Sequence, residues 1–128
     1  MRILAFDSSM RHLVRACRAL SDETRLRILR VLMDQSCCVT EVVRALGISQ
    51  TRASRNLMTL YDAGFLTQNR HGPWCLYSID DGRGAGYSRD LIRVVGQALE
   101  GDETVSRDRQ RLKDARSLPH PDQPSESR

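Results

Sequence analysis

Apolar residues recur at helical spacing along most of the first hundred positions, which predicts a mainly α-helical chain. The second of the expected helices is apolar nearly all round, as a buried central helix would be, and Ser21 is its expected N-cap. The last is apolar over more of its surface than one small domain needs to cover, which favours burial against another subunit. Helices are expected over residues 9–20, 22–33, 40–46, 49–63 and 88–100, with a turn at 34–38.

Two short segments break the helical pattern and predict a β-hairpin. Residues 65–70 and 74–79 read as strands, and His71, Gly72 and Pro73 form the tip between them. A hairpin that directly follows two short helices is typical of a winged helix. The expected fold is therefore mainly α (α+β), a winged helix-turn-helix of order α-α-α-α-β-β-α.

The segment TEVVRALGISQTRASRNLMTL, residues 40–60, carries the strongest functional signal. Gly47 ends its first helix, and Ser49 is a good N-cap for the second. From residue 42 to 61 every charged side chain is an arginine, whereas an ordinary solvated helix hairpin, the alternative, would usually mix in acids. The residues expected to contact DNA are Ser49, Gln50, Thr51, Arg52, Ser54, Arg55 and Asn56, with Arg70 and His71 on the wing.

The composition is compatible with a DNA-binding protein and disfavours a membrane or secreted protein, but it does not identify the function. The 128 residues carry a net charge of +4, which is compatible with a polyanionic partner such as DNA. No apolar run approaches the roughly 20 residues that span a bilayer, and the start MRILAFDSS is unlike a signal peptide, so a cytoplasmic protein is expected. We expect one domain over residues 1–101 and a charged tail over 102–128, which continues in part as a polar helix and ends in disorder.

Three segments together resemble the arsenic-repressor (ArsR/SmtB) family of winged helix-turn-helix regulators. These are RALSDETRLRILRVL, ALGISQTRASRNLMTLYDAGFL and RHGPWCLYSI. The resemblance implies a homodimer, formed through the first and last helices, that represses transcription at a palindromic operator and needs no cofactor to bind it. It also implies release of the operator when an effector binds. The chain departs from the family at Asn56, where a histidine is frequent.

The four cysteines are the candidate effector ligands. Arsenite-sensing members of the family carry C-V-C-D-L-C at the start of the third helix, and here only Cys38 matches, with Cys37 directly before it. Backbone N–H groups at a helix N-terminus favour the thiolate, so this pair is expected to bind As(III), Sb(III) or another soft metal. A third ligand stays open between Cys17, expected to be small and buried, and Cys75, expected on a wing strand far from the pair.

Other functions remain open at the level of sequence. The same cysteines could sense oxidants or sulfur species, or the regulator could be blind to effectors. A thiol enzyme is disfavoured because no His or acid stands convincingly near Cys37 in sequence, so we expect a protein that is not an enzyme. A zinc site on the last helix is disfavoured because residues 88–100 contain no histidine.

Overall fold

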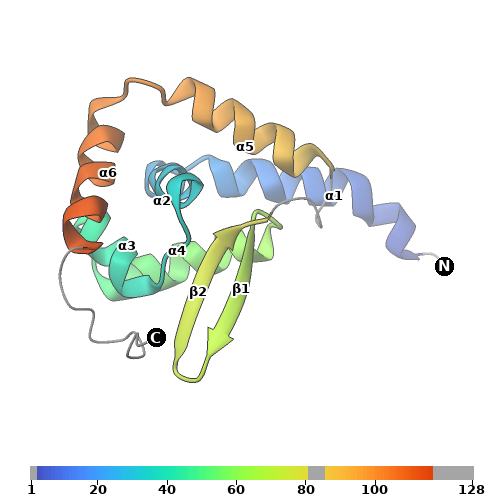
Figure 1. The fold of residues 1–128 in the computed structure, drawn as a ribbon. Helices are drawn as coiled ribbons and strands as arrows, with labels where there is room; N and C mark the ends of the chain where they lie inside the picture. The colour runs from blue at the N-terminus through green and yellow to red at the C-terminus, as the bar shows by residue number, and fades with distance from the viewer. Residues whose placement is uncertain (1–2, 81–85, 117–128) are drawn as a thin grey trace.

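The computed structural model describes residues 3–80 and 86–116, and it confirms a mainly helical winged helix-turn-helix (Figure 1). Its elements are α1 (Ile3–Leu20), α2 (Glu23–Asp34), α3 (Val39–Leu46), α4 (Gln50–Asp62), β1 (Leu66–His71), β2 (Trp74–Ile79), α5 (Gly86–Ala98) and α6 (Glu103–Arg116). The order therefore contains one helix more than expected, at the C-terminal end.

Helix α2 lies at the centre of the molecule, as its nearly continuous apolar surface predicted. It contacts every other helix and strand β2, and its residues Ile28, Leu29 and Val31 are fully buried. The N-cap is Asp22 and not the expected Ser21: the Asp22 carboxylate accepts the Arg25 N–H at 3.0 Å. The Ser21 hydroxyl instead donates to Arg18 O at the end of α1.

The wing is a two-stranded antiparallel hairpin, β1–β2, anchored to the helices by one further backbone bridge. The N–H of Cys37 donates to Tyr77 O at 3.0 Å, and the Tyr77 N–H donates back to Cys37 O at 2.8 Å. The segment expected as a plain turn thus ties the N-terminal end of α3 to strand β2. This bridge holds the cysteine pair beside the wing.

Helix α6 occupies much of the segment expected as a charged tail, and it packs on α3 and α2. Val105, Asp108, Leu112 and Ala115 are its buried positions, at helical spacings of three and four. Because Asp108 is a charged residue in the middle of this buried face, the apolar periodicity of the sequence does not reveal the face. The expected disorder of the final dozen residues falls on 117–128, outside the described residues.

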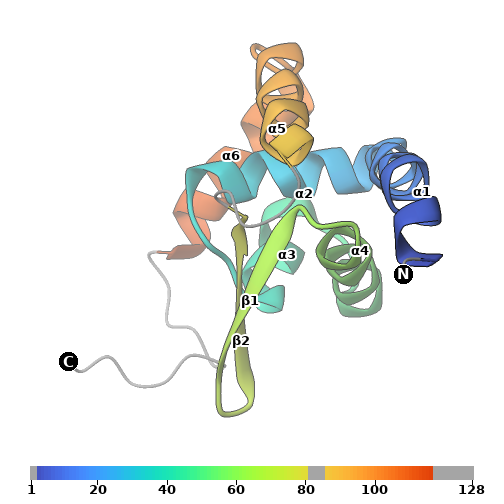
Figure 2. The same ribbon diagram turned by 90° about the vertical axis from the view of Figure 1, so that its right-hand side faces the viewer.

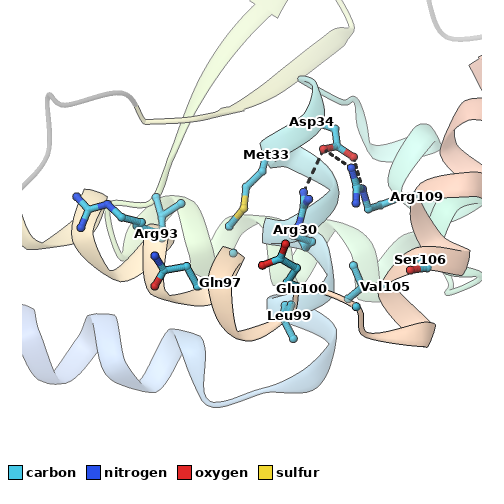
Figure 3. A pocket seen from close by; sticks show the side chains of 13 residues that line it. Arg30, Met33, Asp34, Arg93, Gln97, Leu99, Glu100, Val105, Ser106 and Arg109 are labelled. Atoms are coloured by element: carbon cyan, nitrogen blue, oxygen red, sulfur yellow. Dashed lines mark hydrogen bonds and ion pairs between the residues drawn. The ribbon is translucent and has the colours of Figure 1, made fainter.

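Ion pairs hold α6 in place. The fully buried Asp108 accepts two bonds of 2.8 Å from Arg27 on α2 and one of 2.9 Å from Arg111. Figure 3 shows a second set, in which Asp34 at the end of α2 lies between Arg30 and Arg109. Helix α6 is therefore attached to α2 by ion pairs as well as by apolar packing.

Helices α1 and α5 leave apolar side chains uncovered. Met10 on α1 is 74% exposed and Val94 on α5 is 55% exposed, and Leu13 and Val14 are exposed as well. In Figure 2, α5 lies across α2 from the wing tip, whereas α1 lies beside α2. Within the described part of the chain no helix is long and apolar enough to cross a membrane.

Candidate DNA-binding surface and thiol cluster

The orientation of α4 is set by its cap and its buried face. Gly47 takes the left-handed conformation, with φ of 70°, that turns the chain from α3 towards α4. The Ser49 hydroxyl then accepts the Arg52 N–H at 3.1 Å and starts the helix. Ala53 and Leu57 face the core and are fully buried. The residues left exposed along α4 and its cap include Ser49, Gln50, Thr51, Arg52, Ser54 and Arg55.

Two of the expected DNA-contacting residues also hold α4 against α2. An Arg52 Nη atom donates to the Thr24 hydroxyl at 2.7 Å. The half-buried Asn56 accepts a 2.9 Å bond from Arg25 through its side-chain oxygen and donates to Arg52 O through its nitrogen. Sequence reading missed Arg25, which bonds Ala19 O as well and so ties α4 to the α1–α2 corner. No periodic signal marks a residue whose role is a long-range hydrogen bond.

The wing places its two expected contact residues at its exposed end. Arg70 lies opposite Cys75 in the strand register, and His71 lies opposite Trp74. The rings of His71 and Trp74 pack with centroids 5.4 Å apart. The hairpin projects beyond the helical body on the side where α3 and α4 lie (Figures 1 and 2). Wing tip and recognition helix thus face the same side of the molecule.

The two adjacent cysteines lie in different environments. Cys37 is fully buried, and its thiol lies 3.6 Å from Gln35 O. Burial raises its pKa to about 12, with a further rise from Glu41 and an opposing effect of Arg116. Burial also raises the pKa of Cys38, against an opposing effect of the neighbouring Trp74. The N–H groups of Thr40 and Glu41 at the start of α3 lower the pKa of Cys38, as predicted, but burial outweighs them and the net shift is upward.

A buried carboxylate organises the turn that holds the cysteines. Glu41 is 2% exposed and accepts the Cys38 N–H at 2.9 Å, which closes the first turn of α3. Its other oxygen pairs with Arg116 Nε, the last residue of α6, at 2.6 Å. Arg116 also donates to Ser36 O at 2.7 Å. The end of α6 thus covers the cysteine turn.

The structure brings together two cysteines that the sequence separated. Cys38 and Cys75 line the same pocket of about 290 Å³, so the expectation that Cys75 lies far from the pair is wrong for Cys38. The expectation that Cys17 is buried is also wrong for the single chain, because this residue is exposed on α1. Within residues 3–80 and 86–116, no three His, Cys, Asp or Glu side chains form a metal-binding cluster.

Sequence comparisons place these features among bacterial regulators. The profile described as "Bacterial regulatory protein, arsR family" matches residues 22–68, from the start of α2 to strand β1. The chain is 35% identical over 91 residues to the "Probable mercury resistance operon repressor" of Streptomyces lividans, covering 71% of this chain and 69% of that protein. It is 30% identical over 87 residues to the arsenical resistance operon repressor of Bacillus subtilis, covering 66% and 83%.

Solved structures share the fold. The AntR antimony-specific transcriptional repressor matches with a TM-score of 0.59 and 26% identity, over 80% of this chain and 89% of that one. The homodimeric winged helix-turn-helix DNA-binding domain Mb0332 of Mycobacterium bovis matches with a TM-score of 0.62 and 24% identity, over 80% and 90%. The arginine-bearing helix α4, the wing and these relatives agree: the chain belongs to the ArsR family of bacterial regulatory proteins.

Proposed function

We propose that this protein is a homodimeric repressor that binds a palindromic operator through α4 and the wing. The observation that carries the proposal is the exposed, arginine-bearing face of α4, which contains no acidic side chain from Ser49 to Tyr61. Gln50 and Arg52 suit base edges in the major groove, whereas Thr51, Ser54 and Arg55 suit base edges or phosphates. Arg70 and His71 extend the contact to the neighbouring groove or backbone.

The uncovered apolar faces support the homodimer. Met10 on α1 and Val94 on α5 would be covered by a second copy of the chain, placed by a two-fold axis. Two copies of α4 then enter successive major grooves about 34 Å apart, which is why the operator should be palindromic. Such a protein works on DNA in the cytoplasm and needs no cofactor to bind it.

The effector is proposed to be a thiol-seeking species that binds the cysteine cluster. Relatives of this chain are named for mercury, arsenical and antimony responses, and thiolates are the protein ligands that soft metals prefer. Cys37 and Cys38 remain the proposed sensing segment, with Cys75 as the additional thiol that shares a pocket with Cys38.

Replacing Arg55 tests the DNA-binding surface. This exposed arginine lies on the face of α4 opposite the core, so we expect Arg55→Ala to weaken operator binding about tenfold or more at fixed salt. Fluorescence anisotropy with a fragment of the protein's own promoter region measures the affinity. The matched control is Arg107→Ala, which removes an exposed arginine on α6. Equal affinities of Arg55→Ala and wild type would contradict the assignment.

Operator release tests the effector. Arsenite, antimonite, cadmium, mercuric ion and a persulfide are added in turn to the protein–operator complex. We expect at least one to release the wild type and not the Cys37/Cys38 double serine variant, with Cys38→Ser alone included because Cys37 is part of the core. Cys17→Ser is the control. Release that is identical in all variants would identify a regulator that does not use these thiols.

A further inference from the structure

We propose that Cys38 and Cys75 form a dithiol site that binds a two-coordinate soft cation such as Hg²⁺ between α3 and the wing. This inference rests on the proposed function and names the chemistry of its effector site. The two cysteines come from different elements, the N-cap of α3 and strand β2, and both line one pocket with Trp74 and Gln50. The Cys75 side chain also interacts with Tyr77. A ligand that joins the two cysteines therefore joins two parts of the fold.

The backbone around each cysteine is already held in place. Glu41 accepts the Cys38 N–H at 2.9 Å, and strand pairing places Cys75 opposite Arg70. The neighbouring bridge between Cys37 and Tyr77 ties the turn before α3 to β2, two residues beyond Cys75. The pocket is thus built on rigid elements, which favours binding without large rearrangement.

The available ligands select the coordination number. Cys37 lies on the core side and is fully buried, with its thiol near Gln35 O and with Glu41 and Arg116 as charged neighbours. Among the residues that the structure describes, no cluster of three ligating side chains exists. Trivalent arsenic is best held by three thiolates, whereas mercuric ion forms stable complexes with two thiolates in a linear arrangement. Two cysteines across one pocket therefore fit mercuric ion better than arsenite.

The binding step is a simple exchange of protons for metal. Hg²⁺ displaces the proton of each thiol, two S–Hg bonds form, and two protons leave to solvent, with no change in oxidation state. Because Gln50 begins α4 and Trp74 lies next to the wing tip, the same ion sits between the two proposed DNA-contacting elements. A metal bridge would fix the position of the wing relative to the start of α3, and it would do so without passing through the dimer helices.

Trp74 provides a direct readout because it is the only tryptophan in the chain and lines the pocket. Mercuric chloride is titrated into the reduced, full-length Cys17→Ser protein in excess glutathione, and tryptophan emission is recorded. The background variant removes the exposed thiol on α1, and glutathione removes mercury from single thiols. We expect quenching that saturates at one equivalent per protomer.

Single serine variants decide whether both thiols are ligands. In the same background, Cys38→Ser and Cys75→Ser should each abolish the stoichiometric quenching, whereas Cys37→Ser should keep it. Serine is a favourable N-cap, so Cys38→Ser should fold, and thermal unfolding checks each variant. Stoichiometric quenching that persists in Cys75→Ser, or that requires Cys37 in a folded variant, would overturn the site.

Operator anisotropy on the same samples separates this inference from the proposed function. Quenching that depends on both cysteines while the operator stays bound would support the site and contradict its role as the effector site. Mercury-driven release that is unchanged in Cys75→Ser would leave the repressor proposal standing and overturn the dithiol.

Discussion

At the scale of single residues, the position of each cysteine at the start of α3 decides whether its side chain is in the core or lines a pocket. Cys37 and Cys38 are adjacent, yet the first is in the core and the second lines a pocket. The same divergence affects the polar residues of α4. Within the described residues, the exposed Arg55 side chain has no hydrogen-bond or ion-pair partner. The neighbouring Asn56 side chain, in contrast, accepts a hydrogen bond from Arg25 and donates one to Arg52 O. Asn56 therefore has a structural role whatever it does at DNA.

Cys37 should make stability depend on alkaline pH. Its pKa is about 12 in the folded protein, above the ordinary value of 9.0, so the unfolded chain loses this proton first. The stabilisation is fully present below pH 9 and is lost as the pH rises towards 12. We expect the free energy of unfolding, measured with urea under reducing conditions, to fall from pH 8 to 10.5.

The variant Cys37→Ala should flatten that dependence, although it will also lower stability by leaving a small cavity in the core. The matched control is Cys17→Ala, which removes an exposed thiol and should keep the wild-type slope. If Cys37→Ala retained the full slope, the pH dependence would have to come from other groups, such as Tyr77, whose pKa burial also raises.

At the scale of elements, α6 is the feature that completes the helix-turn-helix. Its Arg111 donates to Ala45 O at 2.8 Å, near the end of α3, and Arg27 donates to the neighbouring Leu46 O at 3.1 Å. Its Arg116 neutralises the buried Glu41. Helix α3 is only eight residues long, so these contacts stabilise an element that would be marginal alone.

Removing α6 should destabilise the domain and open the cysteine turn. A chain that ends at Asp102 leaves Glu41 without its arginine. Breaking a buried ion pair typically costs about 3–5 kcal/mol, and we expect this pair to contribute less than that because Arg116 is 38% exposed. Urea unfolding measures the stability, and mass spectrometry measures alkylation of Cys37. A chain that ends at Arg116 is the control. Equal alkylation rates in the two chains would show that α6 does not protect Cys37.

At the scale of the whole molecule, the elements proposed to contact DNA and the elements proposed to form the dimer are arranged around α2. In Figure 2 the wing and α4 lie below α2, α5 lies above it and α1 lies beside it. Helices α1 and α5 carry exposed apolar residues such as Met10 and Val94. Helix α2 contacts α1 and α5 as well as α4 and β2. Helix α2 is therefore the helix that contacts both sets of elements.

A charge on the apolar face of α5 should separate the protomers. Val94 is 55% exposed in the single chain, so Val94→Glu should disturb the fold of one protomer little and weaken the dimer. Sedimentation velocity measures the oligomeric state, and operator anisotropy should fall with it because two half-sites are no longer bound together. Thr104→Glu, at an exposed position of α6, is the control. A Val94→Glu protein that remained a dimer would place the interface elsewhere.

The sequence alone determined the winged helix-turn-helix and the face of α4, because both follow from local signals: apolar periodicity, Gly47 and the Ser49 cap. The tertiary structure decided the rest. The polar helix expected in the tail is present as α6, but its buried stripe was not predicted, because Asp108 interrupts the apolar positions and is stabilised by arginines, one of them 81 residues away. The pocket that Cys38 and Cys75 both line was not predicted, because strand pairing joins residues that are far apart in the chain, and no local pattern records which two surfaces a fold will bring together.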